Sequence, residues 1–242
     1  MEILSVGYDV ALIASEEPEA YDLARPIRRR IGFATGWSKP FKSLWVMQRV
    51  TNAIQRAATV RGERAHEVEI VFRLGAGLHS ETEPSRDPVR LRPLVMGDAS
   101  FPERRGIVVQ LGAKWQTIGL ERATIGAVIA MLAQARAQLI GSPADRDAVR
   151  DLAGSAVYEI LPDIASWKRT IDSARIVVTP DTGTAHLAGM LGVPAIDLFP
   201  DRDAAAHIAR WHPWAAPYTA LTACELRGGE GLARIERVLD AY

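Results

Sequence analysis

Short apolar runs alternate with longer stretches of helical composition through the second half of the chain. Five of these runs have the length and composition of buried strands, at residues 106–111, 137–140, 157–161, 176–178 and 193–199. Helices are expected between and beyond them, at residues 120–135, 144–153, 162–173, 185–191 and 231–242. Strands that alternate with helices at this spacing predict an α/β fold with a doubly wound, Rossmann-like parallel sheet.

The pattern of the first half is less regular. Strands are expected at residues 8–14 and 31–33, and helices at residues 18–30, 44–58 and 65–74. The first of these helices ends in three arginines, Arg28 to Arg30, which suit a helix C-terminus. Prolines then punctuate residues 84–97, which we interpret as an extended linker between domains. The expected domains are therefore residues 1–97 and residues 98–242.

Composition narrows the class of protein. The 242 residues are 48% hydrophobic and 24% charged, with a formal net charge of zero, so no global field favours nucleic acid. The single cysteine, Cys224, excludes an intrachain disulfide and suits a reducing compartment. The start has no signal-peptide pattern, and no apolar run approaches the roughly 20 residues of a membrane span. We expect a cytoplasmic protein with at most peripheral membrane contact.

The strongest chemical signal lies at residues 173–200, which follow the order strand, polar turn, helix, strand. The turn Asp181-Thr182-Gly183 stands at the carboxyl end of one strand and the amino end of the next helix. Ligands bind at this edge of open α/β sheets, and free helix amides there favour anions. A second strand-to-helix turn, Gly112-Ala113-Lys114-Trp115, is expected at the same edge and supplies a flexible cation. Together the two turns predict a diphosphate pocket.

Asp181 is the exception in this set, because a carboxylate repels a diphosphate. We expect it to cap the helix that follows, or to orient Lys114 or a sugar hydroxyl. Four further histidines have no metal-ligand spacing and are expected on surfaces or loops: His66, His79, His207 and His212. The candidate ligand-binding residues are Gly112, Lys114, Asp181, Thr182, Gly183, Thr184 and His186, with no metal and no cofactor.

Several of these residues belong to motifs that resemble those of a known family. The block at residues 178–188, with Gly192-Val193-Pro194 and Phe199-Pro200 behind it, resembles the family 9 glycosyltransferases, the ADP-heptose:lipopolysaccharide heptosyltransferases and their relatives. That family carries an Asp-Thr-Gly-x-x-His turn, a helix and a Gly-x-Pro strand. The loop at residues 112–115 resembles its glycine, lysine, tryptophan loop, and residues 140–143 its Gly-Gly-Pro-like turn.

The resemblance implies a GT-B architecture of two facing Rossmann-like domains. It implies a nucleotide-diphospho-sugar donor, such as ADP-heptose, held by the loop lysine and the Asp-Thr-Gly-x-x-His turn of the C-terminal domain. Transfer to a saccharide or lipopolysaccharide-type acceptor would invert the anomeric centre and use no metal. A base from the amino-terminal domain would take the acceptor proton, while the lysine and helix amides stabilise the departing diphosphate.

The sequence departs from the family at its start. Family members open with a strand, a glycine-rich turn and an acidic candidate base before the segment that Tyr8-Asp9-Val10 resembles. Asp9 is expected inside a strand, so the role of base does not pass to it, and the catalytic base is unassigned. Three hypotheses remain open: an active glycosyltransferase, a degenerate nucleotide-sugar-binding protein of the same fold, and a start codon assigned too far downstream.

Overall fold

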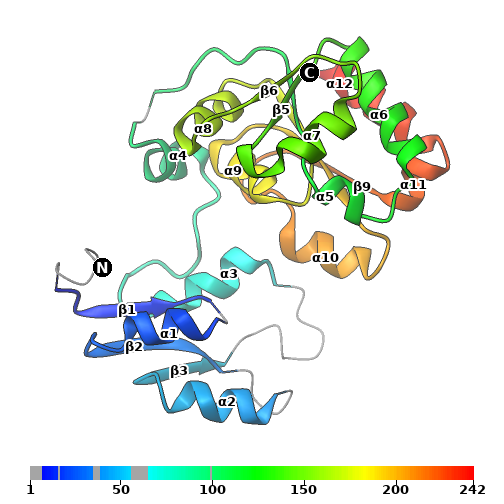
Figure 1. Ribbon diagram of the computed structural model, residues 1–242. Coiled ribbons are helices and arrows are strands. Elements are labelled where there is room, and N and C mark those ends of the chain that lie inside the picture. The colour runs from blue at the N-terminus through cyan, green and yellow to red at the C-terminus, as the bar shows by residue number, and fades with distance from the viewer. Residues whose placement is uncertain (1–6, 16, 35–38, 56–64, 99) are drawn as a thin grey trace. The chain divides into compact units, whose positions relative to one another are not determined.

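The computed structural model describes residues 7–15, 17–34, 39–55, 65–98 and 100–242. The chain forms two compact units, Met1–Pro84 and Ser85–Tyr242, and each is described here by itself (Figure 1). The division directly follows Pro84, the first of the prolines that were expected to mark the linker. Over the described ranges, no helix is both long and apolar enough to cross a membrane.

The C-terminal unit is built on a six-stranded sheet in the order β6-β5-β4-β7-β8-β9. Every neighbouring pair is parallel, as the sequence pattern predicts. The strands are β4 (Ile107–Gln110), β5 (Gln138–Gly141), β6 (Tyr158–Ile160), β7 (Ile176–Pro180), β8 (Ala195–Phe199) and β9 (Tyr218–Thr222). The edge strand β9 was not predicted, because its burial is only partial and its pattern is weak.

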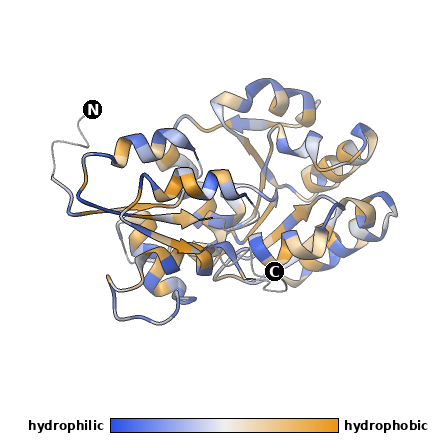
Figure 2. Ribbon diagram, turned by 90° about the horizontal axis from the view of Figure 1, so that it is seen from below, coloured by the Kyte–Doolittle hydropathy of each residue, from blue (hydrophilic) through white to orange (hydrophobic). Residues whose placement is uncertain are grey.

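Helices cover both faces of this sheet, which makes it doubly wound. One face packs against α6 (Arg122–Gln134), α7 (Arg146–Ala153), α11 (Ala223–Arg227) and α12 (Glu230–Ala241). The other packs against α4 (Pro88–Met96), α8 (Ile164–Asp172) and α9 (Gly183–Leu191). The strands between the two layers are largely hydrophobic (Figure 2). Burial of apolar surface on both faces stabilises the parallel sheet.

The expected extended linker is wrong, because most of it forms the helix α4. Asp87 caps this helix by accepting a hydrogen bond from the Val89 amide at 2.9 Å, and Pro88 occupies the first turn, where no amide partner is needed. The helix ends at Gly97, whose φ of 75° is the left-handed conformation that favours glycine. Local capping and packing against α9 outweigh the cost of Pro93 in the helix interior.

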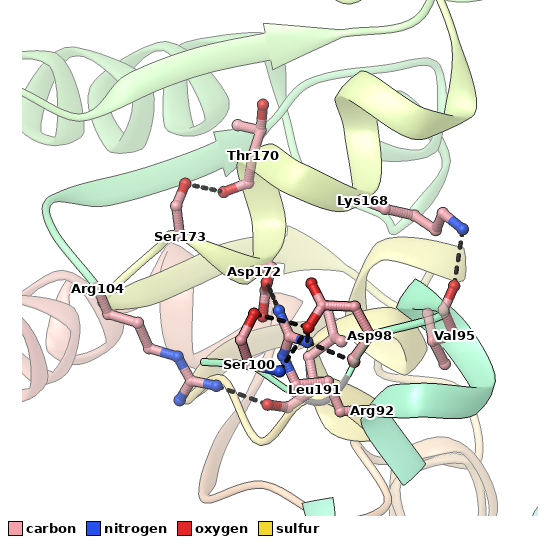
Figure 3. Close-up of polar contacts among 10 residues, drawn as sticks. All are labelled: Arg92, Val95, Asp98, Ser100, Arg104, Lys168, Thr170, Asp172, Ser173 and Leu191. Atoms are coloured by element: carbon pink, nitrogen blue, oxygen red, sulfur yellow. Dashed lines mark hydrogen bonds and ion pairs between the residues drawn. The ribbon is translucent and has the colours of Figure 1, made fainter. Parts of the chain in front are cut away.

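Polar contacts connect α4 and the segment after it to α8 and α9 within the C-terminal unit (Figure 3). The buried guanidinium of Arg92 forms an ion pair with Asp172 at the end of α8. Lys168 donates to the Val95 carbonyl at 2.7 Å. Arg104 donates to the carbonyls of Leu191 and Gly192, both at 2.6 Å, and so places a cation at the C-terminus of α9.

The N-terminal unit contains a three-stranded parallel sheet in the order β1-β2-β3. Its strands are β1 (Val10–Ile13), β2 (Arg29–Ala34) and β3 (Asn52–Gln55), and its helices are α1 (Pro18–Ala24), α2 (Pro40–Met47), α3 (Glu67–Phe72) and the short 3₁₀ turn η4 (Arg73–Gly75). The strands expected at residues 8–14 and 31–33 and the helical character of residues 65–74 are confirmed.

Two helices expected in this unit are too long. The helix starting at Pro18 ends at Ala24, because Pro26 has no amide to continue it, and Arg29 and Arg30 belong to a strand instead. The helix expected at residues 44–58 stops at Met47, and residues 52–55 pair with β2 as a strand; residues 56–58 lie outside the described residues. Residues 52–55 form a strand because they pair with β2, and the local pattern of residues carries no information about that pairing.

Candidate functional site

The two turns singled out in the sequence meet at one edge of the C-terminal sheet. Strands β4 and β7 are hydrogen-bonded neighbours, so their carboxyl ends lie side by side. A pocket of about 580 Å³ opens there, lined by residues that follow both strands. Five of the seven candidate residues line it: Gly112, Lys114, Thr182, Gly183 and Thr184. Asp181 and His186 are not in its lining.

A hydrogen-bonded network that the sequence did not reveal joins the two turns. The buried Gln110, the last residue of β4, accepts through Oε1 from Thr179 Oγ1 at 2.8 Å and from Thr182 Oγ1 at 3.3 Å. Its backbone carbonyl accepts from the indole of the fully buried Trp115 at 2.7 Å. Trp115 is therefore a packing residue, and Gln110 fixes the loop and the turn relative to each other.

Asp145 also lines the pocket and holds the Lys114 loop in place. Its carboxylate accepts from the Ala113 amide at 3.3 Å and from Ser142 Oγ at 2.8 Å. A Cβ at Gly112 would lie 3.2 Å from that carboxylate and 2.9 Å from Gln110 Nε2. A side chain at residue 112 would therefore displace Gln110 or Asp145, whereas a Cβ at Gly183 would meet no atom within 4 Å. The backbone of the second turn is thus the one left open to approach.

Helix α9 is capped by Thr182, so the expectation that Asp181 caps it is wrong. Thr182 Oγ1 accepts from the Thr184 amide at 3.3 Å and also contacts Thr179 Oγ1 at 3.0 Å. The first turn of α9 leaves backbone N–H groups without helical partners beside the pocket. Together with the Lys114 ammonium, these groups give the pocket donors and positive charge suited to an anion.

Asp181 interacts with the cationic groups around the pocket. Its Oδ1 atom lies 3.6 Å from His186 Nε2. Burial raises the pKa of Asp181, and His186, Lys114 and His207 oppose that shift. Burial lowers the pKa of His186, which Asp181 opposes and His212 reinforces. Asp181 is thus coupled electrostatically to Lys114, and its orienting role stays a prediction.

Part of the pocket lining is apolar. It is formed by Leu161, Ile164, Trp167 and Leu187, from the end of β6, from α8 and from α9, and the charged Asp163 and Lys168 lie among them. Such a wall beside an anion-binding rim fits a ligand with a flat or apolar group attached to a charged one. The sequence pattern assigned none of these residues to the site, because each one also reads as part of a helix or strand core.

Other candidate residues have structural positions. Asp9 is exposed and precedes β1, so the expectation that it lies inside a strand is wrong. His66 lies in the loop before α3, as one of the two expected positions has it, but it is buried and caps that helix in a capping box with Glu69. His79 and His212 pack against the rings of Phe72 and Tyr218, at centroid distances of 4.3 and 4.7 Å.

Comparison with known proteins identifies the family of the chain and its fold. The model of glycosyltransferase family 9 (heptosyltransferase) matches residues 2–229. The Escherichia coli heptosyltransferase WaaC with ADP is 19% identical with a TM-score of 0.62, over 94% of this chain and 73% of that one. No curated protein sequence gives a significant match.

Two further solved structures show the same fold. A family 9 glycosyl transferase from Veillonella parvula DSM 2008 is 12% identical with a TM-score of 0.60, over 96% of this chain and 68% of that one. E. coli ADP-heptose lps heptosyltransferase II is 15% identical with a TM-score of 0.57, over 95% and 78%. The family and fold class expected from the sequence are confirmed.

Proposed function

The chain belongs to glycosyltransferase family 9, and from that premise we propose that its C-terminal unit binds the diphosphate of a nucleotide-diphospho-sugar. The observation that carries the proposal is the pocket that brings Lys114 together with Thr182, Gly183 and Thr184. A cation and free helix amides at one mouth stabilise a diphosphate, and they stabilise it more as negative charge accumulates on it during departure.

We propose ADP-heptose or a closely related sugar nucleotide as the donor. Structures of E. coli WaaC with ADP and with ADP-2-deoxy-2-fluoro heptose support this choice. The apolar wall containing Trp167 suits the base, and the rim suits the diphosphate. The acceptor is proposed to be a saccharide or lipopolysaccharide-type glycan.

The chemistry is proposed to be an inverting transfer without a metal ion. Lys114 and the α9 amides would stabilise the leaving diphosphate, and Asp181 would orient Lys114. Two outcomes test this part: a chelator should leave transfer unchanged, and product analysis should show inversion at the anomeric carbon. Family membership favours an active transferase over a degenerate binding protein, and no base is assigned here.

The decisive experiment measures ADP binding by calorimetry in the wild type and in Lys114→Ala. Losing a charge-assisted hydrogen bond should weaken binding by about 1.5–3 kcal/mol. Arg175→Ala is the matched control, because Arg175 is exposed and precedes β7 at the opposite edge of the same sheet. An unchanged affinity in Lys114→Ala would contradict the proposal that Lys114 binds the diphosphate.

Turnover is tested separately. Release of nucleotide from ADP-heptose should rise when a glycan acceptor extract is added to the protein. Binding without any release in either condition would support the degenerate binding protein instead.

A further inference from the structure

A second carboxyl group, Asp197, lies buried behind the Asp-Thr-Gly turn. Asp197 is the third residue of β8 and has no exposed surface. Its neighbours Ile196 and Leu198 belong to the core under α6 and α12, whereas Ala195 belongs to the core under α8 and α9. Because side chains alternate along a strand, the carboxyl of Asp197 faces the side of the sheet that carries α9.

The backbone connects Asp197 directly to the turn. Thr179 is its register partner on β7, and the Asp181 amide donates to the Leu198 carbonyl at 3.1 Å. Thr179 in turn belongs to the network with Gln110 and Thr182 at the pocket. Asp197 is therefore one strand away from the residues that hold the proposed diphosphate site.

Neither oxygen of Asp197 has a hydrogen-bond partner among the described residues. A buried carboxylate without partners is costly, and such a group takes up a proton instead. Burial and then the charge of Asp181 raise the pKa of Asp197 well above its usual range. The Leu198 amide weakly opposes this shift, although it does not reach the geometry of a hydrogen bond with either oxygen.

The basic groups around Asp181 come from three neighbouring segments. Lys114 lies at the start of α5 (Lys114–Thr117), His186 in α9, and His207 in α10 (Ala204–Trp211), and all three interact electrostatically with Asp181. With Asp197 neutral, a diphosphate held by Lys114 lies near one carboxylate of this pair, Asp181. With Asp197 ionised, a second negative charge would lie beside Asp181 and oppose binding of the diphosphate.

We propose that Asp197 is a positioning residue that stays protonated while a nucleotide diphosphate is bound, and that its ionisation expels the nucleotide and sets an alkaline limit on donor binding. The inference rests on the proposed function and extends it, because it makes binding of the donor dependent on a proton held outside the pocket. The proton is bound by Asp197 itself and passes to solvent when the carboxyl ionises.

The test is calorimetric binding of ADP from about pH 6 to about pH 10 in the wild type and in Asp197→Asn, each normalised to its affinity at neutral pH. In the wild type, affinity should fall about tenfold or more at the alkaline end, the effect of one extra nearby charge. In Asp197→Asn the fall should be less than about threefold, since the amide does not ionise. Losses caused by other ionisable groups remain in both proteins.

Two further proteins complete the design. Asp197→Ala also removes the ionising group and should show the same flat profile, so a folding defect of one variant does not decide the outcome. Asp240→Asn makes the same substitution at an exposed residue of α12, away from the pocket, and should follow the wild type. Coincident profiles for the wild type and both Asp197 variants would overturn the inference while leaving the proposed function intact.

An independent measurement addresses the proton directly. Infrared spectra of protein with ¹³C-labelled aspartate should contain the carbonyl band of a protonated carboxyl at neutral pH, and Asp197→Asn should lose it. Absence of that band from the wild type would overturn the inference whatever the binding data show. Failure of ADP to bind any of these proteins at any pH would overturn the proposed function and the inference together.

Discussion

Two regions of the C-terminal unit each bury a carboxyl group, and their surroundings are opposite. Asp172 ends α8 and meets the buried guanidinium of Arg92 from α4, with Asp98 and Arg104 nearby (Figure 3). Asp197 lies in the central part of the sheet and faces Asp181, a group of the same charge. The first region fastens a chain segment to the sheet. The second lies against the proposed donor site.

The difference indicates what each carboxyl contributes. An ion pair compensates the burial of Asp172, even though its Oδ1 atom has no partner of its own among the described residues. Nothing comparable compensates Asp197. A fold that retains an uncompensated buried acid is less stable for it, and such groups cluster at functional sites.

The largest change in stability should come from breaking the ion pair between Arg92 and Asp172. Arg92→Met leaves Asp172 buried without its cation, so the free energy of unfolding should fall by about 3–5 kcal/mol, measured by urea denaturation. The double variant Arg92→Met/Asp172→Leu replaces both charges with apolar groups and should recover most of the loss. A loss below about 1 kcal/mol in the single variant would show that the pair is not buried as described.

Removing the unpaired carboxyl of Asp197 should change the free energy of unfolding in the opposite direction. Asp197→Asn should raise the free energy of unfolding at neutral pH by about 1–3 kcal/mol, because it removes the cost of keeping an acid in the core. The pKa of Asp197 is raised in the folded state, so its contribution to stability is complete below the unfolded value of about 3.9 and is lost as the pH rises through the folded value.

That linkage gives the comparison a pH signature. The stability difference between Asp197→Asn and the wild type should be smallest in acid, should grow as the pH rises, and should level off above the folded pKa of Asp197. Urea denaturation at a series of pH values measures it. A difference that stays constant with pH would mean that Asp197 is already ionised in the folded protein.

A smaller effect is expected at the N-terminus of α9, the helix that both regions contact. Thr182→Ala removes the cap and should cost about 1 kcal/mol of unfolding free energy. Thr182→Ser keeps the capping oxygen and serves as the control. Equal losses in the two variants would assign the effect to the Thr182 methyl group and not to the cap.

The smallest effect belongs to an ion pair at the surface. Arg122 pairs with Asp151 between α6 and α7, with side chains 77% and 43% exposed. Arg122→Met should change the free energy of unfolding by no more than about 0.5 kcal/mol, because solvent screens the pair. If Arg122→Met lost nearly as much unfolding free energy as Arg92→Met, burial would not explain the difference between the two ion pairs.

The sequence predicted those helices and strands whose ends are marked by residues in the local sequence. Gly192 directly follows the helix predicted at residues 185–191 and adopts the left-handed φ of 68° that a C-cap glycine requires. The β-branched run before Asp181 marked β7, and strand–helix alternation was enough for the doubly wound sheet. Elements without such markers were missed or misread: α4 looked like a linker, and β3 looked like the end of a helix.

The candidate site divides in the same way. The sequence by itself determined the two turns, Gly112 to Trp115 and Asp181 to His186, because each is a contiguous motif at the end of a strand. Only the tertiary structure decided that Gln110 joins them, that Thr182 and not Asp181 caps α9, and that Asp197 lies unpaired behind them. The physical reason is that hydrogen-bond partners and burial come from strands paired across the sheet, and no local pattern of residues encodes that pairing.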